Sequence, residues 1–175
     1  MIVEPLHPQD VEAARSLYLE AFPEYERADW DSLVSHSGWG DAELLGLYDG
    51  GLVGISYVIF DETVLFVLYL AVDLSHRGAG AGSEALRLIE ERFSPGRVFL
   101  NIEPPDEECD NREQRVRRLA FYERNGFSQA WRFSVREGEN YLVMCRGEAI
   151  TPEELDSFRV RHRFSRLFYG ASKLS

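Results

Sequence analysis

Hydrophobic and polar positions along the chain alternate between strand-like and helix-like patterns. Short apolar runs with strand character occupy residues 2–6, 43–49, 52–60, 63–72, 97–102, 127–135 and 140–145. Apolar positions recur at helical spacing in residues 8–22, 83–94, 111–125 and 151–168, and a short helix is expected within 23–40. This order predicts an α/β fold, one domain built on a mixed sheet with a helical tail.

The apolar run at residues 63–72 differs from the other predicted strands because it has no polar face. Its residues from Val64 to Val72 are apolar apart from the hydroxyl of Tyr69. A strand of this kind is covered on both sides, so we expect it at the centre of the sheet. In the helix at 111–125 we expect Val116, Leu119 and Ala120 to face the core.

The last predicted helix begins at a strong start signal. Thr151-Pro152-Glu153-Glu154 combines a capping box with proline at the first helical position. The apolar positions of this helix are Leu155, Phe158, Phe164, Leu167 and Phe168. This aromatic face must be buried, either against its own domain or against a partner subunit, and the sequence does not decide between the two. We therefore divide the chain into a domain at 1–147 and a tail at 148–175.

Composition narrows the function classes. The 175 residues carry 30 acidic and 19 basic side chains, a net charge of −11, which disfavours nucleic acid as a partner. No apolar run is long enough for a membrane span, and the first residues lack a signal-peptide pattern. The two cysteines and four histidines show no metal-ligand spacing, so no metal is expected. We expect a soluble cytoplasmic protein.

The segment Arg77-Gly78-Ala79-Gly80-Ala81-Gly82 joins the central strand to the next helix. Glycines at alternate positions let backbone N–H groups converge at a helix N-terminus, where they bind an anion such as a phosphate. The alternative is a flexible turn without a ligand. The loop has no lysine for a P-loop, and its glycine spacing does not match the dinucleotide-binding fingerprint.

Two motifs resemble those of the GNAT superfamily of N-acetyltransferases, over about residues 2–146. The first is Leu70-Ala71-Val72-Asp73 followed, after three residues, by the glycine loop. The second is Phe121-Tyr122-Glu123-Arg124-Asn125-Gly126-Phe127. The order of predicted elements also matches that family's plan. The resemblance implies the GNAT acyltransferase fold and an acetyl-CoA-dependent enzyme of the small bacterial type.

The resemblance also implies roles for individual residues. The loop and the helix start would hold the pyrophosphate of acetyl-CoA, and the strand end would pair with its pantetheine arm; the residues are Leu70, Ala71, Val72, Arg77, Gly78, Ala79, Gly80, Ala81, Gly82 and Ser83. The backbone N–H near Val72 would face the thioester oxygen. Tyr122 matches the tyrosine that protonates the departing thiolate in many members.

The general base is less defined, because the central strand lacks the glutamate that many members carry. Glu103, directly after the strand at 97–102, is the nearest carboxylate, with Glu26 and Tyr25 as second choices. The alternative for Glu103 is a solvated loop residue. Arg115 and Arg118 stand where the family often has asparagine and alanine. With Arg112 and Arg117 they would reach the CoA phosphates or pair with residues 106–110.

The acceptor is expected to be a small cationic primary amine, because the segment thought to cover its site carries Glu24, Glu26, Asp29 and Asp31. Peptide or protein N-termini are the alternative acceptors, and a non-catalytic acyl-CoA-binding module is the alternative function. The aromatic residues Phe22, Tyr25, Trp30 and Trp39 line the acceptor pocket or belong to ordinary packing. The expected partners are acetyl-CoA and the amine. Because many members of the family are dimers, we also expect a homodimer.

Overall fold

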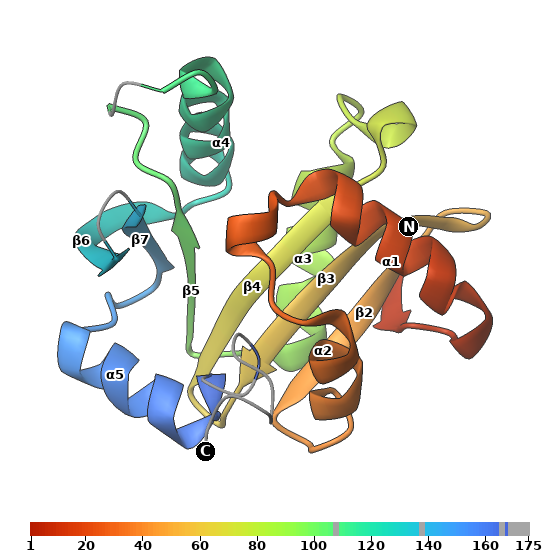
Figure 1. Ribbon diagram of the computed structural model, residues 1–175, viewed down its shortest axis with the longest axis horizontal. Helices are drawn as coiled ribbons and strands as arrows, with labels where there is room; N and C mark the ends of the chain where they lie inside the picture. Colours follow the sequence, from red (N-terminus) through yellow and green to blue (C-terminus); the bar gives the residue numbers. More distant parts are fainter. Residues whose placement is uncertain (107–108, 137–138, 165–166, 168–175) are drawn as a thin grey trace.

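The computed structural model describes residues 1–106, 109–136, 139–164 and 167, as Figure 1 shows. One mixed sheet is formed by seven strands: β1 (Ile2–Pro5), β2 (Ala42–Tyr48), β3 (Leu52–Phe60), β4 (Val64–Val72), β5 (Arg97–Ile102), β6 (Ser128–Arg136) and β7 (Glu139–Arg146). The α-helices are α1 (Val11–Ala21), α2 (Trp30–His36), α3 (Ala81–Phe93), α4 (Arg112–Arg124) and α5 (Pro152–Arg161). Single 3-10 turns are η1 (Pro8–Asp10), η2 (Glu24–Glu26) and η3 (Leu74–His76).

The strand order β1-β2-β3-β4-β5-β7-β6 places β4 in the middle of the sheet, as its apolar run predicts. All neighbouring strands are antiparallel except β4 and β5. That parallel pairing covers only Val64–Phe66 against Arg97–Phe99. Beyond Phe66 the two strands separate, and the rest of β4 has backbone groups on that side without a strand partner (Figure 1).

A β-bulge interrupts β4 where it leaves β5. Tyr57 pairs with Tyr69 and Val58 pairs with Val67, so Leu68 is the extra residue. Phe66 before the bulge and Tyr69 and Ala71 after it all belong to the core cluster that includes residues of α1 and α2, so they lie on the same side of the sheet. An uninterrupted strand would send Tyr69 to the opposite face, because side chains alternate with a period of two. The bulge therefore decides which layer Tyr69 enters.

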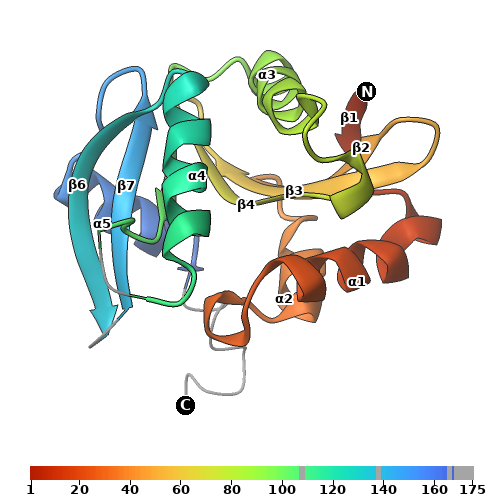
Figure 2. The same cartoon turned by 90° about the horizontal axis from the view of Figure 1, so that it is seen from above.

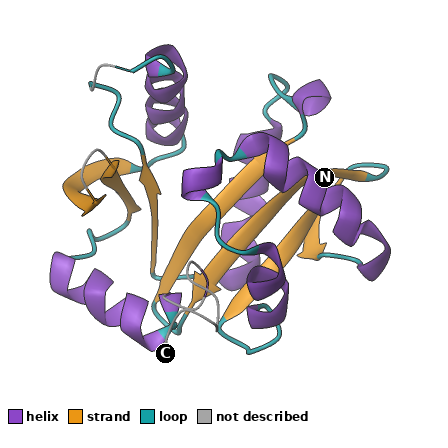
Figure 3. Ribbon diagram, viewed as in Figure 1, coloured by secondary structure: helices purple, strands orange, loops and turns teal. Residues whose placement is uncertain are grey.

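Helices cover both faces of the sheet, with α3 on one side and α1 and α2 on the other (Figure 2). The core beside α3 includes Leu86 and Ile89 together with Leu65 and Leu100. In Figure 3 these helices are purple and the strands that they cover are orange. No helix within the described ranges is long and apolar enough to cross a bilayer.

The prediction for the inward face of α4 is partly wrong. Val116 is 43% exposed, and none of the helix residues is fully buried. Leu119 and Tyr122 pack only partly against the core. The side of α4 that lines the cleft instead carries Arg117, Arg118, Phe121 and Tyr122.

The tail helix α5 packs on the domain itself. The predicted capping box is present, with the Thr151 hydroxyl accepting from the Glu154 backbone N–H at 3.2 Å. Leu155, Phe158, Phe164 and Leu167 lie in the same core cluster as the strand residues Phe66 and Phe99. Phe168 lies outside the described residues. The aromatic face of α5 is therefore covered by the chain's own domain. The division into a domain at 1–147 and a tail at 148–175 stays a prediction, and so does the homodimer.

Candidate active site

A cleft of about 2030 Å³ opens where β4 and β5 separate. One half is lined by the glycine loop, the start of α3 and α4. The other half is lined by η2, the end of β5, the β6–β7 hairpin and α5. Single ligand pockets usually measure about 300–1,000 Å³, so this cleft has room for two substrates.

The glycine loop has the backbone geometry of an anion cradle. Gly78 and Gly80 have φ angles of +89° and +82°, which residues with a Cβ rarely adopt. A Cβ at either position would point into open space. Helix α3 begins at Ala81 directly after Gly80, and no side chain caps its N-terminus. The free N–H groups of this first turn fit a phosphate.

The two sequence motifs meet at Gly82. A Cβ on this residue would lie 3.1 Å from the ring of Phe121. Glycine therefore allows α3 and α4 to approach each other beside the cradle. Tyr122, the next residue on α4, consequently reaches the same cleft.

The end of β4 is fixed at the rim of the cradle. Arg77 Nε donates to the carbonyl of Val72 at 2.8 Å. This bond uses one of the five guanidinium N–H groups and leaves others for a ligand. Asn101 on β5 lines the cleft on the opposite side, and its Oδ1 has no hydrogen-bond partner among the described residues.

Tyr122 presents a phenol to the cleft. Its ring packs against Phe121 and Phe127 with centroids 5.0 and 5.6 Å away. Burial raises the pKa of Tyr122 to about 12, and nearby Arg118 opposes that rise. The hydroxyl is therefore protonated at neutral pH, and within the described part of the chain it makes no hydrogen bond. It is a donor available to a ligand.

Glu103 is a buried ion-pair centre. It is only 7% exposed, so the expectation of a solvated loop residue is wrong. Its carboxylate accepts from Arg115 Nη2 at 2.6 Å and from the Tyr25 hydroxyl at 3.1 Å, and Arg118 Nη1 lies 3.5 Å away. A loop position after β5 becomes buried because α4 and η2 close over it.

The arginine cluster on α4 meets Glu103. Arg115 and Arg118 both pair with its carboxylate. Asp106 pairs with Arg132 on β6, at 3.0 Å. Residues 107–108 lie outside the described residues, so a pairing of the cluster with residues 106–110 stays a prediction. Arg117 and Arg118 line the cleft, while Arg112 does not.

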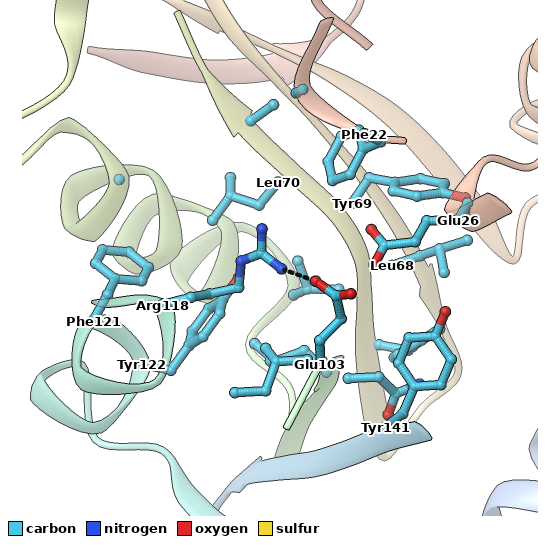
Figure 4. Close-up of a pocket in the computed structure, with 18 of the residues that line it drawn as sticks. Phe22, Glu26, Leu68, Tyr69, Leu70, Glu103, Arg118, Phe121, Tyr122 and Tyr141 are labelled. Atoms are coloured by element: carbon cyan, nitrogen blue, oxygen red, sulfur yellow. Dashed lines mark hydrogen bonds and ion pairs between the residues drawn. The ribbon is translucent and has the colours of Figure 1, made fainter. Parts of the chain in front are cut away.

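Glu26 faces the same hollow as Glu103 from the other side (Figure 4). Burial raises the pKa of Glu26 to about 7, and the charge of Glu103 adds to this rise. Arg118 and Arg115 act in the opposite direction. Glu26 thus exchanges a proton near neutral pH, whereas Glu103 holds two guanidinium groups.

Tyr69 holds the backbone on both sides of Arg27. Its hydroxyl donates to the Glu26 carbonyl at 2.7 Å and accepts from the Ala28 N–H at 2.8 Å. The ring is 4% exposed and lies against Tyr18 and Phe22, with centroids 5.0 and 4.7 Å apart. The one polar group of the central strand therefore fixes η2 over the cleft.

The structure brings nearly all the predicted site residues to this cleft. Of those named from the sequence, Ala79 does not line it; it borders a smaller hollow beside Gly80 and Ser83. Phe22 and Tyr25 line the cleft, while Trp30 is buried in the core and Trp39 is 46% exposed outside it. The sequence did not indicate Tyr141 or Arg159, because late strands and a tail helix carry no motif.

The described residues contain no group of three or more His, Cys, Asp and Glu side chains arranged to hold a metal ion. Four carboxylates, from Glu24, Glu26, Glu103 and Glu139, line the half of the cleft formed by η2, β5 and the β6–β7 hairpin. The same half carries Tyr25 and Tyr141. Burial and three of these carboxylates (Glu26, Glu103 and Glu139) raise the pKa of the Tyr141 phenol. The carboxylate cluster favours a cationic group beside it.

Comparison with known proteins gives consistent matches. The model of the acetyltransferase (GNAT) family matches residues 11–127. YjbC of Bacillus subtilis (strain 168), whose name marks it as a candidate acetyltransferase, is 33% identical over 69 residues. That alignment spans 39% of this chain and 33% of YjbC, so it covers about a third of the relative's length.

Solved structures share the fold over a longer range. A GNAT-family protein from Bacteroides thetaiotaomicron superposes with a TM-score of 0.74 at 21% identity, covering 98% of this chain and 99% of the other. An aminoglycoside 6'-N-acetyltransferase in complex with coenzyme A has a TM-score of 0.66 at 17% identity, covering 87% and 99%. At sequence identities this low, the structural similarity shows a shared fold and nothing about the substrate.

Proposed function

Because the chain belongs to the acetyltransferase (GNAT) family, we propose that it transfers the acetyl group of acetyl-CoA directly to a primary amine of a small molecule that is cationic at that end. The observation that carries this proposal is the continuous cleft from the glycine cradle to the carboxylates around Glu26. One end fits phosphates and the other attracts an ammonium group, so the two substrates meet where β4 and β5 separate.

The CoA half uses backbone groups more than side-chain charge. The N–H groups from Gly78 to Ser83 would hold the pyrophosphate, with Arg77 as an additional donor. The free edge of Leu70, Ala71 and Val72 would pair with the amides of the pantetheine arm, as an added strand does. Cradle and strand edge are adjacent because η3 joins them with a single turn.

The reaction requires one new bond and one broken bond. The amine nitrogen attacks the thioester carbon, the C–N bond forms, and the C–S bond breaks to release CoA as a thiolate. The backbone N–H near Val72 would stabilise the carbonyl oxygen as it gains charge. The attacking nitrogen loses a proton to a base, and the Tyr122 hydroxyl donates to the departing sulfur.

We assign the base role to Glu26. The prediction of Glu103 for this role stays a prediction, but protonating Glu103 would weaken its pairs with Arg115 and Arg118. Glu26 is raised to a pKa of about 7, which suits a group that must accept a proton at neutral pH. Glu103 then contributes the negative charge that keeps Glu26 basic.

The test is release of CoA with a panel of primary amines. We expect turnover with amines that are positively charged at neutral pH, and a loss of turnover in Tyr122→Phe with nearly unchanged acetyl-CoA binding. Proteins and longer peptides with free N-termini in the panel test the alternative acceptor class. Thermal stabilisation by acetyl-CoA without turnover on any amine would contradict the proposal and favour an acyl-CoA-binding module.

A further inference from the structure

The tail helix lines the acceptor half of the cleft with basic residues. Arg159 on α5 and Arg163 just after it border the same cleft as Glu26 and Glu103. No role in the transfer described above uses them. The acceptor half therefore carries carboxylates near the reacting centre and guanidinium groups at the α5 wall.

Arg159 differs from the other partly buried arginines. Arg27, Arg97, Arg115 and Arg118 each donate to a carbonyl or carboxylate. Arg159 donates to no acceptor among the residues that the structure describes. Arg159 lines the cleft, and its nitrogens are not among the fully buried polar atoms that lack a partner, so its N–H groups are available to a ligand there.

The surroundings of Arg159 hold it in place without using its donors. Its guanidinium carbon lies 4.7 Å above the ring of Phe133, an arrangement that fixes the plane of the group. Burial lowers the pKa of Arg159, and Asp156, one turn earlier on α5, is the one carboxylate that opposes this.

A row of aromatic rings connects the two charged regions. Phe133 on β6 stacks on Tyr141 on β7, with centroids 5.6 Å apart. Tyr141 interacts with the carboxylates, and Phe133 carries Arg159. One aromatic ring, that of Phe133, thus connects Arg159 to Tyr141, and both rings line the cleft.

We propose that Arg159 binds a carboxylate of the acceptor, so that the acceptor is a zwitterion with its amine at Glu26 and its acidic group at the α5 wall. This rests on the acetyl transfer proposed above and narrows its substrate class. The occupant is a short amino acid or dipeptide whose body lies on Phe133 and Tyr141. A guanidinium can bind a carboxylate through two parallel hydrogen bonds.

The experiment uses the full chain and matched pairs of acceptors. Each pair differs only in the acidic group: a dipeptide and its C-terminal amide, or 6-aminohexanoate and hexylamine. For the wild type we expect kcat/KM at least tenfold higher for the carboxylate member of the preferred pair. In Arg159→Gln the ratio should fall to about one, through loss of activity on the carboxylate member alone, and Arg159→Lys should be intermediate.

The control is Arg132→Gln, which removes the same charge from β6 outside the cleft and should keep the wild-type ratio. The KM for acetyl-CoA and the Tm report whether Arg159→Gln remains folded. Equal use of both members by the wild type, or an equal loss on both in Arg159→Gln, would overturn the inference while leaving acetyl transfer intact. Absence of transfer to any amine would instead overturn the proposed function.

Discussion

Two glutamates in one cleft show how position changes a carboxylate. Glu103 is held by two arginines and a tyrosine hydroxyl, and Glu26 has burial and a neighbouring negative charge instead. Opposite charges favour the ionised form of a carboxyl, while burial and like charge favour the protonated form. The same side chain therefore serves to hold charge in one place and to move a proton in the other.

Glu26→Gln separates the catalytic role from a structural one. A base acts when deprotonated, so wild-type kcat should rise with pH through about 7. We expect the variant to lose about 100-fold or more in kcat and to lose this pH dependence, while still binding acetyl-CoA. Glu20→Gln on the exposed side of α1 is the control and should keep both.

The stability of the same variant has a predicted sign. The pKa of Glu26 is raised on folding, from 4.5 to about 7, so its stabilising effect is present below 4.5 and is lost as the pH rises through 7. Neutral glutamine avoids that loss. The Tm of Glu26→Gln should exceed that of the wild type at pH 8 and match it at pH 4; a lower Tm at pH 8 would contradict this explanation of the raised pKa.

Tyr69→Phe tests whether the central strand positions the base. Without the hydroxyl, the Glu26 carbonyl and the Ala28 N–H both lose their partner, and the free energy of unfolding should fall by about 1–3 kcal/mol. The midpoint of the pH–kcat profile should also move below 7, because Glu26 would be less firmly held in its desolvated place. Tyr48→Phe at the sheet edge should leave that midpoint unchanged.

At the scale of elements, the site depends on two irregularities of β4. The bulge at Leu68 turns Tyr69 towards η2, and the early end of the β4–β5 pairing exposes the backbone of the strand. Neither feature adds a functional side chain to the strand. Through the bulge, Tyr69 reaches the backbone of η2 beside Glu26 on one face of the strand. Through the early end of the pairing, the backbone groups at the edge of β4 stay free to form hydrogen bonds.

Gly80→Glu tests the loop between β4 and α3. Its side chain would bring a negative charge into the cradle, and its positive φ would be strained. We expect no measurable acetyl-CoA binding by calorimetry. Gly50→Glu at the β2–β3 turn is a matched control, because Gly50 also has a positive φ, of +75°, and open space around it. Retained binding in Gly80→Glu would refute the assignment of the loop.

At the scale of the molecule, buried histidines join the tail to the domain. His36 on α2 and His162 after α5 both approach the carboxylate of Asp41, at 3.2 and 3.0 Å. The Tyr57 hydroxyl lies 3.1 Å from His36 Nδ1, and Asp61 lies 4.0 Å from His162 Nε2. Asp61 also pairs with Arg161, so charged groups from the residue before β2, the turn after β3 and the end of α5 meet here.

This junction predicts acid sensitivity. Burial lowers the pKa of His36 below 6.5, although Asp41 opposes the shift. A histidine with a lowered pKa stabilises the fold above pH 6.5, and that stability is lost as the pH falls below it. Glu26 contributes the opposite slope over this range, so the test uses a Glu26→Gln background. There the Tm should decrease between pH 7 and 5, and less steeply when His36→Gln is added. His7→Gln, on a half-exposed histidine, should retain the slope of this background; an equal slope in His36→Gln would exclude His36 as the cause.

The site was predictable where chemistry depends on consecutive residues. The glycine spacing of 77–82 and the Phe121-Tyr122 pair are local, so their meeting at one cleft follows once the strand order is known. Glu103 was chosen for its place after β5, but its burial depends on Arg115 and Tyr25, which are distant in the sequence. Arg159 carried no signal, because its importance depends on the ring of Phe133 and on a missing partner.

By itself, the sequence determined the mixed sheet, the central position of β4, the capped tail helix and the glycine loop before α3. These follow from periodicity, turn residues and backbone freedom, which act within a few residues. The tertiary structure alone decided which carboxylate is paired and which takes up a proton near neutral pH, which face Tyr69 enters, and where α5 packs. Those outcomes depend on desolvation and on the distances between charges that are far apart in the sequence. Both are set only when the chain folds.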